Sequence, residues 1–261
     1  MTHPPSVNSA LVQSVDAIHR SVSYLQGYFP NPELVEVHGA ETWRHKEKTA
    51  LLASYLKCVR IAGTLNACLA LLQVGHVQEV YALCRGVEEA GEDITFLAIS
   101  KPHDKSVPKN QARLVAEFFQ EEFVADSVKR FLVSSKRDRV PRKTIHAAMA
   151  RSTVSHDPNR LQVAISTVHR TFSGFVHGAY GHIMDMFNGQ QYRMKGLVGT
   201  PRILECEELL ASYVYRAIAA VRVVTRQLGD EEIDTRLKSF GVLLEKEFDI
   251  LPTPKDRTKA R

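Results

Sequence analysis

The chain has 261 residues, of which 44% are hydrophobic and 24% are charged, with a formal net charge of +5 and a pI near 9.0. These values are typical of a globular protein with enough apolar residues to bury a core. Fourteen glycines and eleven prolines are few for a β-sandwich or a barrel, which needs many turns. The mildly basic balance permits a polyanionic partner without requiring one.

The sequence also predicts the cellular compartment. We find no run of about 18 apolar residues without charge, so we expect no membrane span. The first five residues lack the basic and apolar regions of a secretory signal, which favours a cytoplasmic protein. None of the four cysteines belongs to a Cys-x-x-Cys pair, which favours buried free thiols over a disulfide or a metal site; they are Cys58, Cys68, Cys84 and Cys206.

Apolar residues recur at helical spacing along nearly the whole chain. A first helix is predicted over about 8–29, with Asn8 or Ser9 as its N-cap and a stop at Pro30. Further helices are predicted over about 41–74, 77–100 and 111–133. We interpret Pro102 and Pro108 as part of the loop before the fourth helix.

The second half of the chain shows the same periodicity. A charged loop over 134–143 precedes a short fifth helix that ends near residue 151. Asp157 is a plausible N-cap and Pro158 a first helical residue, and they open a long sixth helix over about 158–188. Residues 190–199 form the one segment that fits an extended structure or a short hairpin. A seventh helix over 201–228 and a last helix to about residue 248 precede a basic tail over 252–261, which we expect to be disordered.

Long helices with short links predict an all-α fold, an up-down bundle of about seven or eight helices. We expect one domain over 1–251, in which 134–157 is a charged insertion of loop and short helix.

The centre of the sixth predicted helix is unusually polar. Arg170 and His177 are seven residues apart, which is two helical turns, so both side chains leave on nearly the same side. Ser173 lies between them. A fixed cation, a titratable imidazole and a hydroxyl on one stripe suit acid–base chemistry on a phosphodiester. The alternative interpretation is a structural polar network.

The third predicted helix supplies carboxylates that could support this stripe. Glu88 and Glu92 are four residues apart within a dense acidic cluster. If the third and sixth helices pack together, one of these carboxylates could hold Arg170 or orient His177. Gly174 and Gly178 would allow a nucleotide or another backbone to approach closely.

Arg170, six intervening residues and then His177, on a late helix of an all-α chain, resemble the Arg-x4–6-His motif of the HEPN superfamily. The resemblance covers eight residues, and Thr171 stands where the family usually has Asn, Asp or His. It implies a helical-bundle, usually dimeric, metal-independent endoribonuclease, of a kind common in bacterial toxin–antitoxin, abortive-infection and CRISPR-associated systems. Arg170 would contact the scissile phosphate, and His177 would be the catalytic acid/base. Many HEPN-like bundles instead act as binding or scaffold modules.

A basic segment follows the fourth predicted helix. Its side chains could contact successive phosphates of a nucleic acid, which would make the affinity for that nucleic acid dependent on salt. No aromatic residue interrupts it, so base stacking is not expected there, and a solvated loop is the alternative. The candidate RNA-binding residues are Lys136, Arg137, Arg139, Arg142 and Lys143.

The sequence offers no strong metal motif, because Asp16 with His19 and His182 with Asp185 are single pairs, so no cofactor is expected. The leading interpretation is an HEPN-like RNA-cleaving or RNA-binding protein of a bacterial defence or toxin–antitoxin type. We expect a homodimer, with RNA and an antitoxin or another protein as partners. The alternative is a non-catalytic helical interaction or scaffold protein with a buried polar network. A third interpretation is a small-molecule-binding or metal-dependent helical enzyme.

Overall fold

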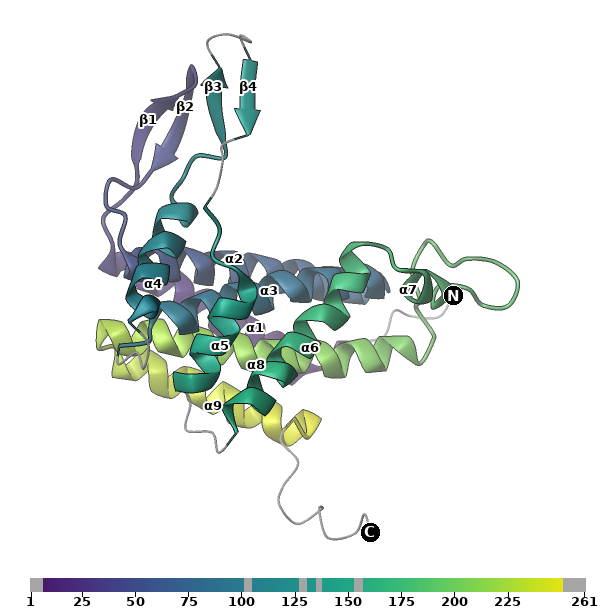
Figure 1. Cartoon of the computed structure of the whole chain (residues 1–261). Helices are drawn as coiled ribbons and strands as arrows, with labels where there is room; N and C mark the ends of the chain where they lie inside the picture. Colours follow the sequence, from purple (N-terminus) through teal and green to yellow (C-terminus); the bar gives the residue numbers. More distant parts are fainter. Residues whose placement is uncertain (1–6, 101–104, 127–130, 135–137, 153–156, 251–261) are drawn as a thin grey trace.

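Figure 1 shows the fold of a computed structural model, which describes residues 7–100, 105–126, 131–134, 138–152 and 157–250. Within these ranges, the side chains of 123–126, 131–134, 161, 164 and 168–171 are outside the description. The expected basic tail over 252–261 also lies outside the described residues.

Helices dominate the described part of the chain, so the expectation of a helical, all-α architecture is confirmed at this level. The helices are α1 (Ser9–Leu25), α2 (Ala50–Gln73), α3 (Val77–Leu97), α4 (Ser106–Phe118), α5 (Arg142–Ser152), α6 (Pro158–Val176), α7 (Tyr180–Met184), α8 (Arg202–Leu228) and α9 (Glu231–Phe248), with a 3-10 turn, η1 (Gln26–Tyr28), after α1.

Five long helices form the main body. Each of α1, α2, α3, α8 and α9 packs against at least two of the others. Their apolar faces share one core, in which Leu11, Leu65, Ile94 and Val214 are fully buried. A second, smaller apolar cluster lies where α4 and α5 cover the end of α3. The periodic apolar residues of the sequence therefore mark the observed core.

The α2 helix is, among the described helices, the one that is long and apolar enough to cross a membrane by length and composition. In the fold, 44% of its most apolar window is buried, and the helix packs against α1, α3 and α8. A core helix passes the same test, so the cytoplasmic location stays a prediction.

Side chains cap the helices where the sequence suggests. The Asn8 side chain accepts a hydrogen bond from the Ala10 N–H at 2.8 Å, as expected for an N-cap. Asp157 accepts one from the Arg160 N–H at 3.0 Å, with Pro158 at the first helical position. These two predictions are confirmed.

The predicted helical start at residue 41 is wrong. Residues 33–44 form an antiparallel hairpin of β1 (Glu33–Val37) and β2 (Ala40–Arg44), and α2 begins only at Ala50. His38 and Gly39 have φ of 54° and 80°, the backbone that a two-residue hairpin turn requires.

The predicted fourth helix over 111–133 is also wrong in its second half. The α4 helix ends at Phe118, and a second hairpin follows with β3 (Phe123–Asp126) and β4 (Phe131–Ser134). The aromatic and β-branched residues of this segment fit a strand as well as a helical stripe. Pro108 lies in the first turn of α4, where its missing N–H has no cost.

Figure 1 shows both hairpins projecting from the same side of the helical body.

Residues 158–188 are two helices, not one. The α6 helix ends at Val176, and the five-residue α7 follows after a sharp turn at Gly178, whose φ is +61°. The loop after α7 contains one bridge between Phe187 and Tyr192, in partial agreement with the expected extended segment.

This loop is fastened to the turn between α2 and α3. The Leu197 N–H donates to the Gly75 carbonyl at 2.8 Å. Gly75 and Gly196 both have positive φ, and a Cβ on Gly196 would collide with the Val74 carbonyl oxygen. The close approach of the two backbones therefore requires glycine at this point. It holds the segment after α7 against the main body.

Candidate functional site

The end of α6 presents the predicted histidine to solvent. The His177 side chain is exposed, and its backbone N–H donates to the Ser173 carbonyl at 3.1 Å. The Ala179 N–H donates to the Gly174 carbonyl at 2.9 Å and the Gly178 N–H to the Phe175 carbonyl at 3.4 Å. This pair of bonds is a Schellman motif, which ends a helix at a glycine with positive φ. The motif fixes where His177 leaves the backbone.

The backbone of Arg170 lies within α6, two turns before His177. Its side chain falls outside the description, so the predicted pairing of its guanidinium with His177 remains a prediction. Ser173 is half-buried on the last turn of the same helix.

A second histidine covers the last turn of α6. The His182 ring stacks on Phe175, with ring centroids 3.7 Å apart. A Cβ on Gly174 would lie only 2.5 Å from His182 Nε2. Gly174 therefore makes room for α7 to fold back onto α6.

Several large apolar side chains close to this junction in the sequence are exposed to solvent. Tyr180 is 79% exposed and Met194 is 75% exposed. Other members are Val176, Ile183, Phe187 and Tyr192. We call these six residues the α7 apolar surface. Such a group of exposed large apolar side chains is typical of a contact site for a partner.

The α3 and α6 helices pack together, which is the condition under which an α3 carboxylate could support the polar stripe. Tyr81 of α3 lies against Phe172 and Phe175 of α6, with ring centroids 6.3 and 4.6 Å apart. The carboxylates of α3, however, have other described partners than His177. Glu88 accepts two bonds from Arg216 Nη1 of α8, at 2.8 and 2.9 Å. Burial raises the pKa of Glu88, and Arg216 partly offsets that effect.

Glu92 belongs to a buried network between α3, α5 and α6. Its Oε1 lies 3.0 Å from Nε2 of His146, and both side chains are 3% exposed. The other ring nitrogen of His146, Nδ1, lies 3.2 Å from the Ser166 hydroxyl of α6. Arg142 Nη1 lies 3.5 Å from the second oxygen of Glu92. Glu92 is thus held inside the fold.

The network continues through Asp93. Its carboxylate accepts a bond from Arg142 at 2.6 Å and one from Lys57 of α2 at 2.7 Å. Burial lowers the pKa of Arg142, but the charge and the hydrogen bond of Asp93 outweigh this effect. The pKa of Arg142 is therefore above its usual value. The Asp93 carboxylate thus joins α2, α3 and α5.

The candidate RNA-binding residues do not share one described surface. Arg142 points into the buried network, and Lys143 lines a cavity of about 320 Å³ between α3, α4 and α5. Arg139 is 74% exposed and lies 3.7 Å from Glu117. Lys136 and Arg137 lie outside the described residues.

Sequence reasoning missed several members of the network. Lys57, His146 and Ser166 carry no local signal, because each is a single polar residue on an apolar helical face. Their roles depend on how α2, α5 and α6 pack around α3. The residues that the structure describes contain no group of three or more His, Cys, Asp or Glu placed to hold a metal ion. All four cysteines are buried free thiols, as predicted.

Comparisons of the chain with protein-family models, with curated proteins and with solved structures gave no match.

Proposed function

We propose that this protein binds RNA and cleaves it at the end of α6, with His177 as the acid/base and Arg170 as the phosphate contact. The observation that carries the proposal is the exposed imidazole of His177 at a helix end fixed by the Schellman motif. A rigid backbone at the reacting group favours catalysis because the geometry is set before the substrate binds. The HEPN resemblance supports the same two residues.

In this proposal His177 removes the proton of a ribose 2′-hydroxyl. The 2′-oxygen then attacks the adjacent phosphorus, the bond to the 5′-oxygen breaks, and the leaving oxygen takes up a proton. The products are a cyclic 2′,3′-phosphate and a 5′-hydroxyl. Arg170 would neutralise the charge that develops on the phosphoryl oxygens, and Ser173 would donate a hydrogen bond one turn away.

Glu88 and Glu92 take a supporting place in the proposal. Each carboxylate already has a cationic partner from α5 or α8. We therefore assign them to holding α3, α5 and α8 together, and not to the reacting phosphate.

The α7 apolar surface supports the proposal of a homodimer or of a complex with an antitoxin or another protein. Its residues flank His177 along the chain, so a partner seated there would border the site. Light scattering after gel filtration distinguishes a dimer from a monomer. Tyr180→Asp should weaken such a dimer, because a carboxylate would be buried in an apolar contact.

The first experiment uses wild-type protein and single-stranded RNA of mixed sequence, with EDTA present. The expected result is cleavage that yields cyclic 2′,3′-phosphate ends. The same sequence made of DNA should stay intact, because it lacks the attacking hydroxyl. RNA that is bound and never cut would restrict the function to binding.

A non-catalytic interaction module is the second candidate. The observation that favours it is the buried network of Glu92, His146, Arg142 and Asp93, which ties α3 to α5. In that case the protein cleaves no RNA, and His177→Ala leaves its interactions unchanged.

A further inference from the structure

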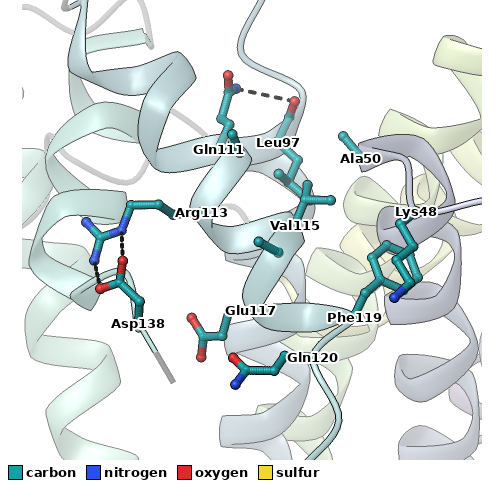
Figure 2. Close-up of a pocket in the computed structure, with 12 residues that line it drawn as sticks. Lys48, Ala50, Leu97, Gln111, Arg113, Val115, Glu117, Phe119, Gln120 and Asp138 are labelled. Atoms are coloured by element: carbon teal, nitrogen blue, oxygen red, sulfur yellow. Dashed lines mark hydrogen bonds and ion pairs between the residues drawn. The ribbon is translucent and has the colours of Figure 1, made fainter. Parts of the chain in front are cut away.

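A cavity of about 760 Å³ lies on α4, beside the beginning of α2 and the end of α3. Figure 2 shows the residues that line it. Its size lies within the range of small-molecule sites, which is roughly 300–1,000 Å³. The apolar part of its lining consists of Ala50, Leu97, Ala112, Val115, Ala116 and Phe119. Ala112 and Ala116 are exposed, so solvent reaches the cavity.

Most polar groups of the cavity have partners within the protein. The Gln111 amide donates to the carbonyls of Phe96 and Ile99 at 2.8 and 3.1 Å. Arg113 forms a two-pronged pair with Asp138 at 2.6 and 3.0 Å. Glu117, which also lines the cavity, lies 3.7 Å from Arg139. These groups shape the rim, and their charges are already paired.

Lys48 differs from them. In the part of the chain that the structure describes, this exposed ammonium makes no hydrogen bond or ion pair, and Figure 2 shows Lys48 among the residues that line the cavity. The nearby carboxylate of Glu121 is held by the Arg44 guanidinium at 2.6 and 2.9 Å. The pKa of Glu121 is lowered, first by the hydrogen bond from Arg44 and least by the charge of Lys48. Among the described lining residues, Lys48 is thus the cation without a direct hydrogen bond or ion pair to the protein.

We propose that this cavity binds a small amphiphilic carboxylate, with its apolar body on the α4 surface and its charged group on Lys48. The apolar body displaces water from Val115, Ala116 and Phe119, which supplies most of the affinity. The ion pair with Lys48 sets the orientation and selects an anion over a cation. The site is separate from the end of α6, so the inference does not depend on the proposed RNA chemistry.

Isothermal titration calorimetry of the full chain with decanoate tests the proposal. One decanoate should bind per chain, and nonyltrimethylammonium, which has the same nine-carbon tail and the opposite charge, should bind at least about fivefold more weakly. Equal binding of the two compounds, or no binding of decanoate, would overturn the proposal.

Matched variants locate the site. Ala116→Phe fills the cavity from an exposed position and should weaken decanoate binding at least tenfold. Ala219→Phe, at an exposed alanine in a different cavity, should leave it unchanged. Lys48→Ala should weaken binding about fivefold, and Lys48→Arg should retain it. Binding that survives Ala116→Phe would contradict the assignment. So would binding to phosphatidylglycerol vesicles without binding to free decanoate, because it would indicate a lipid surface instead.

Discussion

Nε2 of His146 lies 3.0 Å from Oε1 of Glu92, and both side chains are almost completely buried between α3 and α5. His146 thus connects α5 to α3. A second contact between the same helices is the hydrogen bond that Arg142 donates to the Glu89 carbonyl, 53 residues away in the sequence. A buried pair of this kind is costly to break, because the remaining polar group loses its partner inside the fold.

His146→Ala should therefore lower the free energy of unfolding by about 3 kcal/mol. Urea denaturation followed by circular dichroism measures this loss. Arg20→Ala, which removes an exposed ion pair with Asp16, is the control and should change stability little. Combining His146→Ala with Glu92→Gln should cost less than the sum of the two single changes. Additive losses would show that the two residues do not interact.

The junction of α8 and α9 gives a prediction about acid stability. Burial raises the pKa of Asp234, but the hydrogen bond and charge of Arg222, and then of Arg226, outweigh it and hold the pKa below its usual value of 3.8. A lowered pKa in the folded state adds stability above the unfolded pKa, and this part is lost as the pH falls through the folded pKa.

Asp234→Asn should thus destabilise the protein at pH 6, and the difference from wild type should shrink below about pH 4. Thermal unfolding at a series of pH values measures it. A difference that stays constant from pH 6 to pH 2 would contradict the assignment of the stabilising charge to Asp234.

The contact between the loop after α7 and the α2–α3 turn predicts a contrast between two glycines. Gly196→Ala and Gly199→Ala both place an L-residue at positive φ, which costs about 1 kcal/mol. At Gly196 the new Cβ also meets backbone atoms of Val74 and Gly75, whereas around Gly199 the structure leaves space. Gly196→Ala should therefore be clearly the more destabilising in urea. Equal losses would mean that the loop does not pack there in solution.

The cysteines should be inert while the protein is folded. Burial raises the pKa of Cys206 to about 12 and that of Cys58 further still. Alkylation needs the thiolate, so iodoacetamide at pH 8 should label no cysteine in the native state. In guanidinium chloride all four should react, as mass spectrometry can count. Rapid labelling of the native protein would place a thiol on the surface.

The helices of the main body are predictable from the sequence, because apolar residues that recur at helical spacing form a local pattern. The sequence predicts the wrong element where two local patterns compete. Gly178 ends α6 in a Schellman motif, yet apolar residues continue beyond it at helical spacing, so the sequence alone predicts a single helix. The His38–Gly39 pair forms a hairpin turn, but the polar residues around it are equally typical of a loop, so the sequence does not predict the hairpin.

The candidate site was predictable only in part. The exposed position of His177 follows from the end of α6, and that end is set by local hydrogen bonds between neighbouring residues. The partners of Glu88 and Glu92 come from α5 and α8, far along the chain. Those pairings depend on how the helices rotate against one another, which one sequence does not specify.

Cleavage of labelled single-stranded RNA in EDTA by wild type and by His177→Ala tests the central claim most directly. His19→Ala, at an exposed histidine of α1, is the matched control. We predict that His177→Ala lowers the cleavage rate by about 100-fold or more with its thermal stability unchanged, while His19→Ala cleaves as the wild type does. Equal rates for wild type and His177→Ala would contradict the assignment of His177 as the acid/base.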